Sequence, residues 1–259
     1  LRALLTQWAE ENLGATGDFG VLPLIGSKEF VAWLPTFLTS ASLLYPEIAY
    51  PTYLVGAMLA KAEAITVPID AAQWPHAELA WVNSPSNPTG RVHSAEEFRA
   101  AINWSRKSGG VVVSDECYLE FGNTLTTPTS ILKYTGGDNK NILAVHLLSK
   151  RSNLAGYRAA FVVGDKDLIA QILEVRKHAG MMVPLPVQKA MIAALSDSAH
   201  VAEQSARYNA RKAALIPALT AAGFTIEHSE AGLYLWATRN EDCWTSVSWL
   251  ASLGVIATP

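Results

Sequence analysis

The sequence predicts an α/β fold in which a mostly parallel sheet is flanked by helices. Short apolar runs bounded by Gly, Pro, Asn or Asp alternate with longer segments of helical periodicity, and this alternation is typical of α/β domains. Half of the 259 residues are hydrophobic and 17% are charged, so the chain can bury a large core. The sequence contains no internal repeat and no low-complexity tract.

Four apolar runs matter most, because polar residues follow each of them directly. The runs are residues 21–25, 79–82, 110–113 and 142–147, and the polar clusters after them begin at Gly26, Asn83, Ser114 and Ser149. In open α/β sheets, ligands bind outside the carboxyl ends of the strands. We therefore expect the four polar clusters to converge on one crevice.

Helices are predicted between these strands. The capping-box pattern Ser94-Ala95-Glu96-Glu97 predicts a helix that runs to about Lys107. Residues 167–178 carry apolar side chains at helical spacing and predict a second helix. Residues 27–38 predict a third, in which Pro35 should introduce a kink.

The boundary between two domains is expected near residue 200. A long helix over residues 201–222 has apolar and basic sides, and we interpret it as the segment that leaves the first domain. Two strands and a helix of a second, smaller α+β domain are then expected at residues 223–226, 232–236 and 246–253. We assign residues 1–200 to the large domain and residues 201–259 to the start of the small domain.

Composition and charge argue against several classes of protein. The net charge of −3 and the scattered basic residues leave no stripe for nucleic acid, and no run approaches the roughly 18 apolar residues of a membrane span. Cys117 and Cys243 lie far apart, which fits a reducing cytoplasm. No histidine has metal-ligand spacing, so no metal site is expected. The first residue is not Met and the opening reads as a helix cut mid-course, so we expect a chain truncated at both ends.

The segment around Lys150 has the composition of a covalent cofactor site. It reads Leu-Leu-Ser-Lys-Arg-Ser-Asn-Leu-Ala-Gly-Tyr-Arg, so that Lys150 follows an apolar run and Arg158 comes eight residues later. An amine that condenses with an aldehyde needs a fixed and partly desolvated position. A nearby guanidinium can hold a phosphate ester through two parallel hydrogen bonds.

Two upstream segments make this pattern specific. They are Asn87-Pro88-Thr89-Gly90 and Asp115-Glu116-Cys117-Tyr118. With the Lys150 segment, they resemble the class I/II aminotransferases of fold type I, which depend on pyridoxal 5'-phosphate (PLP). The resemblance covers essentially the whole chain, and segments such as Gly-Ser-Lys-Glu-Phe-Val-Ala-Trp-Leu-Pro look like bacterial N-succinyldiaminopimelate aminotransferases.

This resemblance implies a function and a partner. The implied enzyme is a cytoplasmic homodimer that acts on amino-acid and 2-oxo-acid substrates. It would exchange an amino group between glutamate and N-succinyl-diaminopimelate in lysine and diaminopimelate biosynthesis. In the family, an arginine beyond residue 259 binds the substrate carboxylate, so we expect this chain to bind PLP but to turn over poorly, if at all.

The resemblance also implies roles for individual residues. The lysine matched by Lys150 forms the imine with the cofactor and then shuttles a proton between the substrate Cα and the cofactor. Asp115 would keep the pyridine nitrogen protonated, so that the ring can accept electrons. Tyr118 and Asn87 would donate to the phenolic oxygen of the cofactor. Asn87-Pro88 is a plausible cis bond, because only X-Pro bonds adopt cis at low cost.

A second group of residues is implied for the phosphate and the ring face. Arg158 matches the phosphate arginine, and Ser27 and Lys28 would contribute backbone N–H groups at a helix N-terminus. Tyr50 stands where the family places its ring-stacking aromatic residue. The family usually has Ser or Thr three residues before the lysine, where this sequence has Leu147. Ser149 compensates, or the phosphate loses one donor at a cost of about 1 kcal/mol or somewhat more.

Other interpretations of the same residues stay open. Asn87 can simply form a turn, Tyr50 can be a buried core residue, and Glu116 and Glu120 are expected to be outward or structural. A carbon-sulfur lyase of the same fold would use the same cofactor contacts. A PLP-binding effector domain attached to a DNA-binding module is a further alternative, as is a structural relic, although Lys150 and Asp115 are both present.

Overall fold

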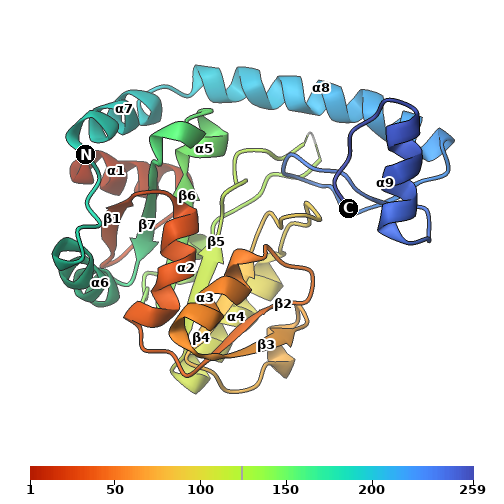
Figure 1. The fold of residues 1–259 in the computed structure, drawn as a ribbon. Helices are drawn as coiled ribbons and strands as arrows, with labels where there is room; N and C mark the ends of the chain where they lie inside the picture. The colour runs from red at the N-terminus through yellow and green to blue at the C-terminus, as the bar shows by residue number, and fades with distance from the viewer. Residues whose placement is uncertain (124) are drawn as a thin grey trace.

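The computed structural model describes residues 1–123 and 125–259 and confirms the expected α/β fold. A seven-stranded sheet forms its centre, with strand order β1-β7-β6-β5-β4-β2-β3 (Figure 1). The strands are β1 (Gly20–Leu24), β2 (Ser42–Pro46), β3 (Glu63–Val67), β4 (Leu79–Asn83), β5 (Val111–Asp115), β6 (Ile142–Leu147) and β7 (Ala160–Gly164).

The sheet is mostly parallel, as predicted. Strands β3, β2, β4, β5 and β6 run parallel to one another, whereas β7 is antiparallel to both of its neighbours, β6 and β1. Two reversals restore the direction, so β1 runs the same way as β6. The carboxyl ends of β1, β4, β5 and β6, the four strands singled out from the sequence, therefore lie at one edge.

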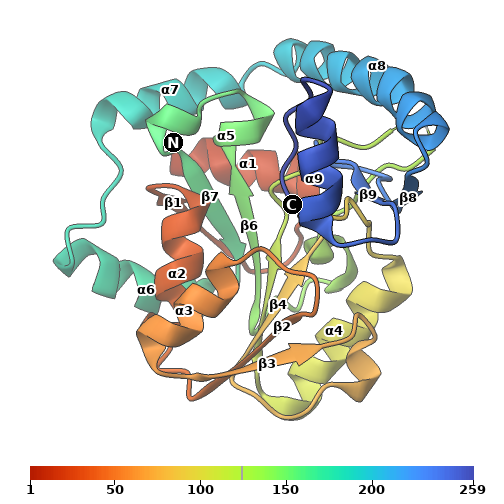
Figure 2. The same cartoon turned by 45° about the vertical axis from the view of Figure 1, so that its right-hand side comes forward.

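Helices cover both faces of this sheet, and the sheet separates two apolar cores (Figures 1 and 2). One core contains side chains of α1 (Arg2–Leu13), α4 (Ala95–Ser108) and α7 (Leu185–Leu195). The other contains side chains of α2 (Ser27–Phe37), α3 (Thr52–Ala60) and α6 (Lys166–His178). Both faces of the parallel strands are buried, which explains why these strands read as continuous apolar runs.

The local sequence signals act at the helix ends where they were expected. The hydroxyl of Ser94 accepts from the Glu97 amide and the Glu97 carboxylate accepts from the Ser94 amide, which completes the predicted capping box of α4. Gly109 then ends α4 in the left-handed conformation. Pro35 lies inside α2, as predicted.

Beyond the sheet, the chain continues through a long helix into a small hairpin unit (Figure 1). Its elements are α8 (Ala199–Ala221), β8 (Thr225–Glu227), β9 (Trp236–Thr238) and α9 (Cys243–Ser252). The strand expected at 232–236 was misplaced, because β9 begins only at Trp236. The preceding residues bond elsewhere: the Ala231 amide donates to the Gly90 carbonyl and the Gly232 amide donates to the Phe121 carbonyl.

A buried ion pair ties the start of α2 to α6. The guanidinium of Arg176 is 1% exposed and makes two parallel hydrogen bonds to the Glu29 carboxylate, at 2.7 and 2.9 Å. Such bidentate pairs fix geometry as well as charge. Glu29 is the third residue of α2, so this pair holds the helix end that borders the site described below.

None of the helices within residues 1–123 and 125–259 is both long enough and apolar enough to cross a membrane.

His93 makes the stability of this fold depend on pH. Burial lowers the pKa of His93 from 6.5 to about 4, with Arg91 adding to the effect and Glu97 opposing it. Between these values the unfolded chain binds more protons than the folded one, so stability falls as the pH falls. We expect the free energy of unfolding to drop by about 2 kcal/mol between pH 7 and pH 5 through this residue.

Urea unfolding of the protein and of the variant His93→Gln at both pH values measures this contribution. The variant should lose about 2 kcal/mol less than the parent on acidification. An identical loss in both proteins would show that His93 is not responsible.

Candidate active site

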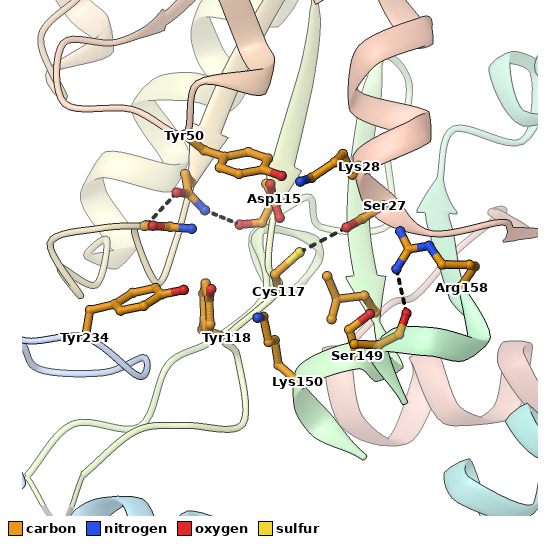
Figure 3. Close-up of a pocket in the computed structure, with 14 residues that line it drawn as sticks. Ser27, Lys28, Tyr50, Asp115, Cys117, Tyr118, Ser149, Lys150, Arg158 and Tyr234 are labelled. Carbon is orange, nitrogen blue, oxygen red and sulfur yellow. Dashed lines mark hydrogen bonds between the residues drawn. The ribbon is translucent and has the colours of Figure 1, made fainter. Parts of the chain in front are cut away.

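All nine residues proposed from the sequence line one cavity of about 300 Å³ (Figure 3). The cavity lies at the edge of the sheet where β1, β4, β5 and β6 end. Its lining residues are Ser27, Lys28, Tyr50, Asn83, Asn87, Asp115, Cys117, Tyr118, Leu147, Ser149, Lys150, Ala155, Arg158 and Tyr234. The convergence expected from the strand ends is therefore present in the structure.

One wall of the cavity is built to receive an anion. Helix α2 begins at Ser27, and the amide groups of its first turn have no partner within the helix. Gly26 precedes it with φ of 97°, and a Cβ atom there would lie 2.3 Å from Nη2 of Arg158. The backbone conformation favours glycine at this position, and its lack of a side chain leaves room for the guanidinium. A helix N-terminus beside an arginine is a favourable position for a phosphate group.

Asp115 lies at the end of β5 and is 4% exposed. Its Oδ2 accepts a hydrogen bond of 3.0 Å from the hydroxyl of Tyr53, whereas its Oδ1 is buried without a partner among the described residues. Burial raises the pKa of the Asp115 carboxyl, and the hydrogen bond from Tyr53 works against that rise. A cationic N–H donor in the cavity would satisfy the free oxygen and favour the ionised carboxylate.

Asn83 connects the two loops that carry Asn87 and Asp115. Its side-chain oxygen accepts from the Asn87 amide at 2.7 Å, and its side-chain nitrogen donates to the Asp115 carbonyl at 2.9 Å. The Asn87-Pro88 bond is cis, as the sequence suggested, and Ser84-Pro85 is cis as well. Asn87 lines the cavity from this loop.

Lys150 enters the cavity from the opposite side (Figure 3). It belongs to the short helix α5 (Leu148–Arg151), which follows β6 directly, and its side chain is half-buried. Leu147 also lines the cavity, so the residue that departs from the family pattern does face the site. Ser149 lines it as well, which leaves a hydroxyl close to the position where one was expected.

Aromatic rings form the remaining walls. Tyr50 lies across the cavity from Lys150, with the Lys28 ammonium 5.8 Å from its ring centroid (Figure 3). The rings of Tyr118 and Tyr234 meet edge to face at 6.1 Å. Burial, followed by the hydrogen bond with Tyr234, raises the pKa of Tyr118, so its hydroxyl stays protonated and can donate.

Four residues of this site were not among the sequence candidates. Asn83, like Asp115, is a polar residue at the end of a buried apolar strand, and that signal was available. Tyr53 is three residues after Tyr50, one helical turn along the chain. Cys117 and Tyr234 carried no comparable signal. The thiol of Cys117 donates to Ser27 Oγ at 3.6 Å, and burial raises its pKa, so it is a neutral lining group.

Glu116 is structural, as one of the two sequence interpretations had it, and it does not point outward. It is 1% exposed, and its Oε1 accepts from the Ile131 amide at 2.8 Å. Its other oxygen lies 3.1 Å from Nε2 of His146. Glu120 forms an ion pair with Arg151 at 2.9 Å.

The arrangement fits PLP on chemical grounds. Within residues 1–123 and 125–259, Asp115 Oδ1 has no hydrogen-bond donor, and a protonated pyridine nitrogen would supply one. The amides of α2 and the Arg158 guanidinium together suit a phosphate dianion, and the Lys150 amine reaches the same cavity. These features are independent of one another, and PLP would need all of them in order to bind.

Known proteins similar to this chain are aminotransferases. A probable aminotransferase of Mycobacterium tuberculosis is 52% identical over 248 residues, which cover 93% of this chain and 59% of that relative. The 4-dedimethylamino-4-oxo-anhydrotetracycline transaminase of Streptomyces rimosus is 49% identical over 267 residues, which cover 100% of this chain and 74% of that relative.

Solved structures agree with this assignment. A probable N-succinyldiaminopimelate aminotransferase of Thermus thermophilus has a TM-score of 0.89 at 27% identity, covering 99% of this chain and 74% of that one. The chain therefore spans about three fifths to three quarters of the length of these proteins. The family model for aminotransferase class I and II, a PLP-dependent group, matches residues 1–259, and the chain belongs to that family.

Proposed function

We propose that this protein is a PLP-dependent aminotransferase and that the cavity at the carboxyl edge of the sheet is its active site. One observation carries the proposal. The cavity brings together the Lys150 amine, a buried Asp115 oxygen that has no partner in the described part of the chain, and the Arg158 guanidinium beside a helix N-terminus. When bound, PLP supplies an electron-accepting ring that stabilises negative charge on the substrate Cα.

Lys150 and Asp115 perform the proton and charge steps in this proposal. Lys150 Nζ would hold the cofactor covalently and, once freed by the substrate amine, would carry a proton from the substrate Cα to the cofactor. Asp115 would hold a proton on the ring nitrogen. The buried position of Asp115 strengthens this interaction, because a low-dielectric environment screens charge poorly.

The other lining residues bind and orient the cofactor. Asn87 and the protonated hydroxyl of Tyr118 would donate to the phenolic oxygen. The amides of Ser27 and Lys28, with Arg158 and Ser149, would bind the phosphate. Tyr50 would stack on the ring, and its own position is supported by the edge-to-face contact with Tyr53 at 5.9 Å.

The substrate assignment is a finer proposal. We propose glutamate as the amino donor and N-succinyl-diaminopimelate as its product, in lysine and diaminopimelate biosynthesis. The similar Thermus thermophilus structure is described as a probable enzyme of that specificity. Other relatives are named for LL-diaminopimelate, at 32% identity, and for a tetracycline intermediate, at 49%. A panel of N-succinyl-diaminopimelate, LL-diaminopimelate and the 4-amino counterpart of that tetracycline intermediate, each with 2-oxoglutarate, would identify the substrate from the rate of glutamate formation.

We also propose that residues 201–259 begin a second domain and that the protein acts as a homodimer. The outer side of α3 and the loop before it support the dimer, because they expose a cluster of apolar side chains. Its members and their exposed fractions are Ile48 47%, Leu54 44%, Val55 45%, Met58 70% and Leu59 45%. Contiguous exposed apolar patches mark interaction surfaces in soluble proteins.

A charge in the centre of this patch should therefore prevent association. Met58→Glu is expected to yield a monomer in light scattering, because a buried unpaired carboxylate at the interface is costly. The exposed substitution Lys107→Glu, on α4 at the opposite face of the sheet, is the control and should leave the mass unchanged. Equal masses for the parent and Met58→Glu would exclude this surface.

The cofactor site is tested by chemical trapping. Borohydride reduction of the PLP-loaded protein should leave a phosphopyridoxyl group on Lys150 in peptide mass maps. Asp115→Ala should weaken PLP binding by about 10- to 100-fold in an absorbance titration, because a hydrogen bond to a charged group is lost. Asp167→Ala, at an exposed position of α6, is the matched control and should bind normally. Trapping on another lysine would overturn the assignment.

Products distinguish the aminotransferase from a lyase of the same fold. With glutamate, the loaded protein should release 2-oxoglutarate without free ammonia. Release of ammonia and pyruvate from a thioether amino acid would favour the carbon-sulfur lyase.

Leu147 provides a quantitative test of the phosphate wall. Leu147→Ser adds a hydroxyl on the lining of the cavity, where the residue is half-buried. One additional hydrogen bond to the phosphate contributes about 1 kcal/mol, so the dissociation constant for PLP should fall by about fivefold. Leu147→Ala removes the leucine without adding a donor and should not show that gain. Equal affinity of the two variants would contradict the role given to this position.

A further inference from the structure

A hydrogen-bonded Ser-His-Asp group lies outside the cofactor cavity. Ser152 Oγ is 2.9 Å from Nε2 of His200, and Nδ1 of His200 is 2.8 Å from Oδ2 of Asp197. Ser152 follows the last residue of α5, whereas Asp197 and His200 lie at the start of α8, which passes beside α5 in Figure 1. None of the three residues lines the cavity that contains Lys150.

The carboxylate and the imidazole hold each other in the orientation that a general base needs. Asp197 Oδ1 accepts from the Ala199 amide at 2.8 Å, which turns Oδ2 toward His200. The hydrogen bond with His200 is the first cause that lowers the pKa of the Asp197 carboxyl, so this group is ionised and acts as an acceptor. His200 Nδ1 is then the donor of that pair. Its Nε2 keeps a lone pair directed at the Ser152 hydroxyl.

A buried cation stands beside the serine. Nη1 of Arg151 is 3.3 Å from Ser152 Oγ and donates to it, which leaves the hydroxyl hydrogen for His200. The guanidinium is 5% exposed and is fixed by Glu120 at 2.9 Å and by the Ala194 carbonyl at 2.7 Å. A fixed positive charge at this distance stabilises negative charge that develops next to the serine oxygen.

Small molecules can reach this group. The side chain of His200 is 33% exposed and that of Asp197 is 53% exposed, and Ser152 is half-buried. An open position selects by reactivity more than by shape. The chemistry therefore favours small acyl esters with a good leaving group.

We propose that Ser152 is the nucleophile of a second, acyl-accepting site, with His200 as its general base and Asp197 as the residue that orients the base. Ser152 Oγ attacks the ester carbonyl while its proton passes to His200 Nε2. The acyl–oxygen bond of the ester breaks, and the leaving alkoxide or phenolate takes that proton. The acyl group remains on Ser152 until water, deprotonated by the same imidazole, releases it as the carboxylic acid.

Reactivity separates this proposal from a purely structural link between α5 and α8. The probes are a fluorophosphonate, which labels activated serines irreversibly, and p-nitrophenyl acetate, whose acetyl adduct can be located by mass spectrometry. Ser108 is the matched comparison within the chain. It is also half-buried at a helix end, but its hydroxyl donates to the Trp104 carbonyl at 2.8 Å and faces no base. Ser152 should be modified about 100-fold faster than Ser108, the low end of what a general base contributes.

Three variants test whether the Ser-His-Asp group causes the reactivity of Ser152. Ser152→Ala should remove the adduct, and His200→Gln, whose amide can hydrogen-bond but cannot act as a base, should lower the labelling rate of Ser152 to that of Ser108. Asp197→Asn should lower the labelling rate of Ser152 by a smaller factor. The rates of both variants are measured on protein whose circular dichroism spectrum matches that of the parent. PLP binding should be unaffected in all three, because these residues lie outside the cofactor cavity. Labelling of Ser152 at the rate of Ser108, or labelling that is unchanged in both His200→Gln and Asp197→Asn, would overturn the proposal.

Discussion

The site depends on one constraint, a carboxylate buried at the end of a parallel strand. Asp115 lies where β5 leaves the core, and desolvation there raises its pKa. Tyr53 satisfies one oxygen, while the other has no partner among the described residues. A buried acceptor without a hydrogen bond destabilises the protein. A hydrogen bond from a pyridinium N–H would remove this penalty when the cofactor binds. The same burial that destabilises the empty site thus provides affinity for the cofactor.

Strand direction decides which residues share that site. Because β7 is antiparallel to β6 and β1 is antiparallel to β7, the ends of β1 and β6 meet on the edge where β4 and β5 also end. This places the N-terminus of α2 against Arg158, with Gly26 between them. Glu29, in the same first turn, would repel an anion there, and the bidentate contact with Arg176 neutralises it.

The C-terminal hairpin unit is joined to the same loops. The amides of Ser229 and Ala231 donate to the carbonyls of Thr89 and Gly90, next to Asn87, and the Gly232 amide donates to Phe121, close to Tyr118. Tyr234 then reaches the cavity from this segment. Movement of the C-terminal unit would therefore also displace Asn87 and Tyr118, the two residues proposed to bind the phenolic oxygen of the cofactor.

The sequence by itself determined the α/β class and the capped helix α4, because periodicity and capping are local signals, and its resemblance to the aminotransferase family implied the nine residues that line the cavity. It did not predict the reversed strand β7, the shift of the second hairpin strand to Trp236, or the contacts of Tyr53 and Asn83 with Asp115. These depend on pairing between residues far apart in the chain. Whether the amides before Trp236 bond to a neighbouring strand or to the Gly90 and Phe121 loops is decided only when those loops are packed beside them.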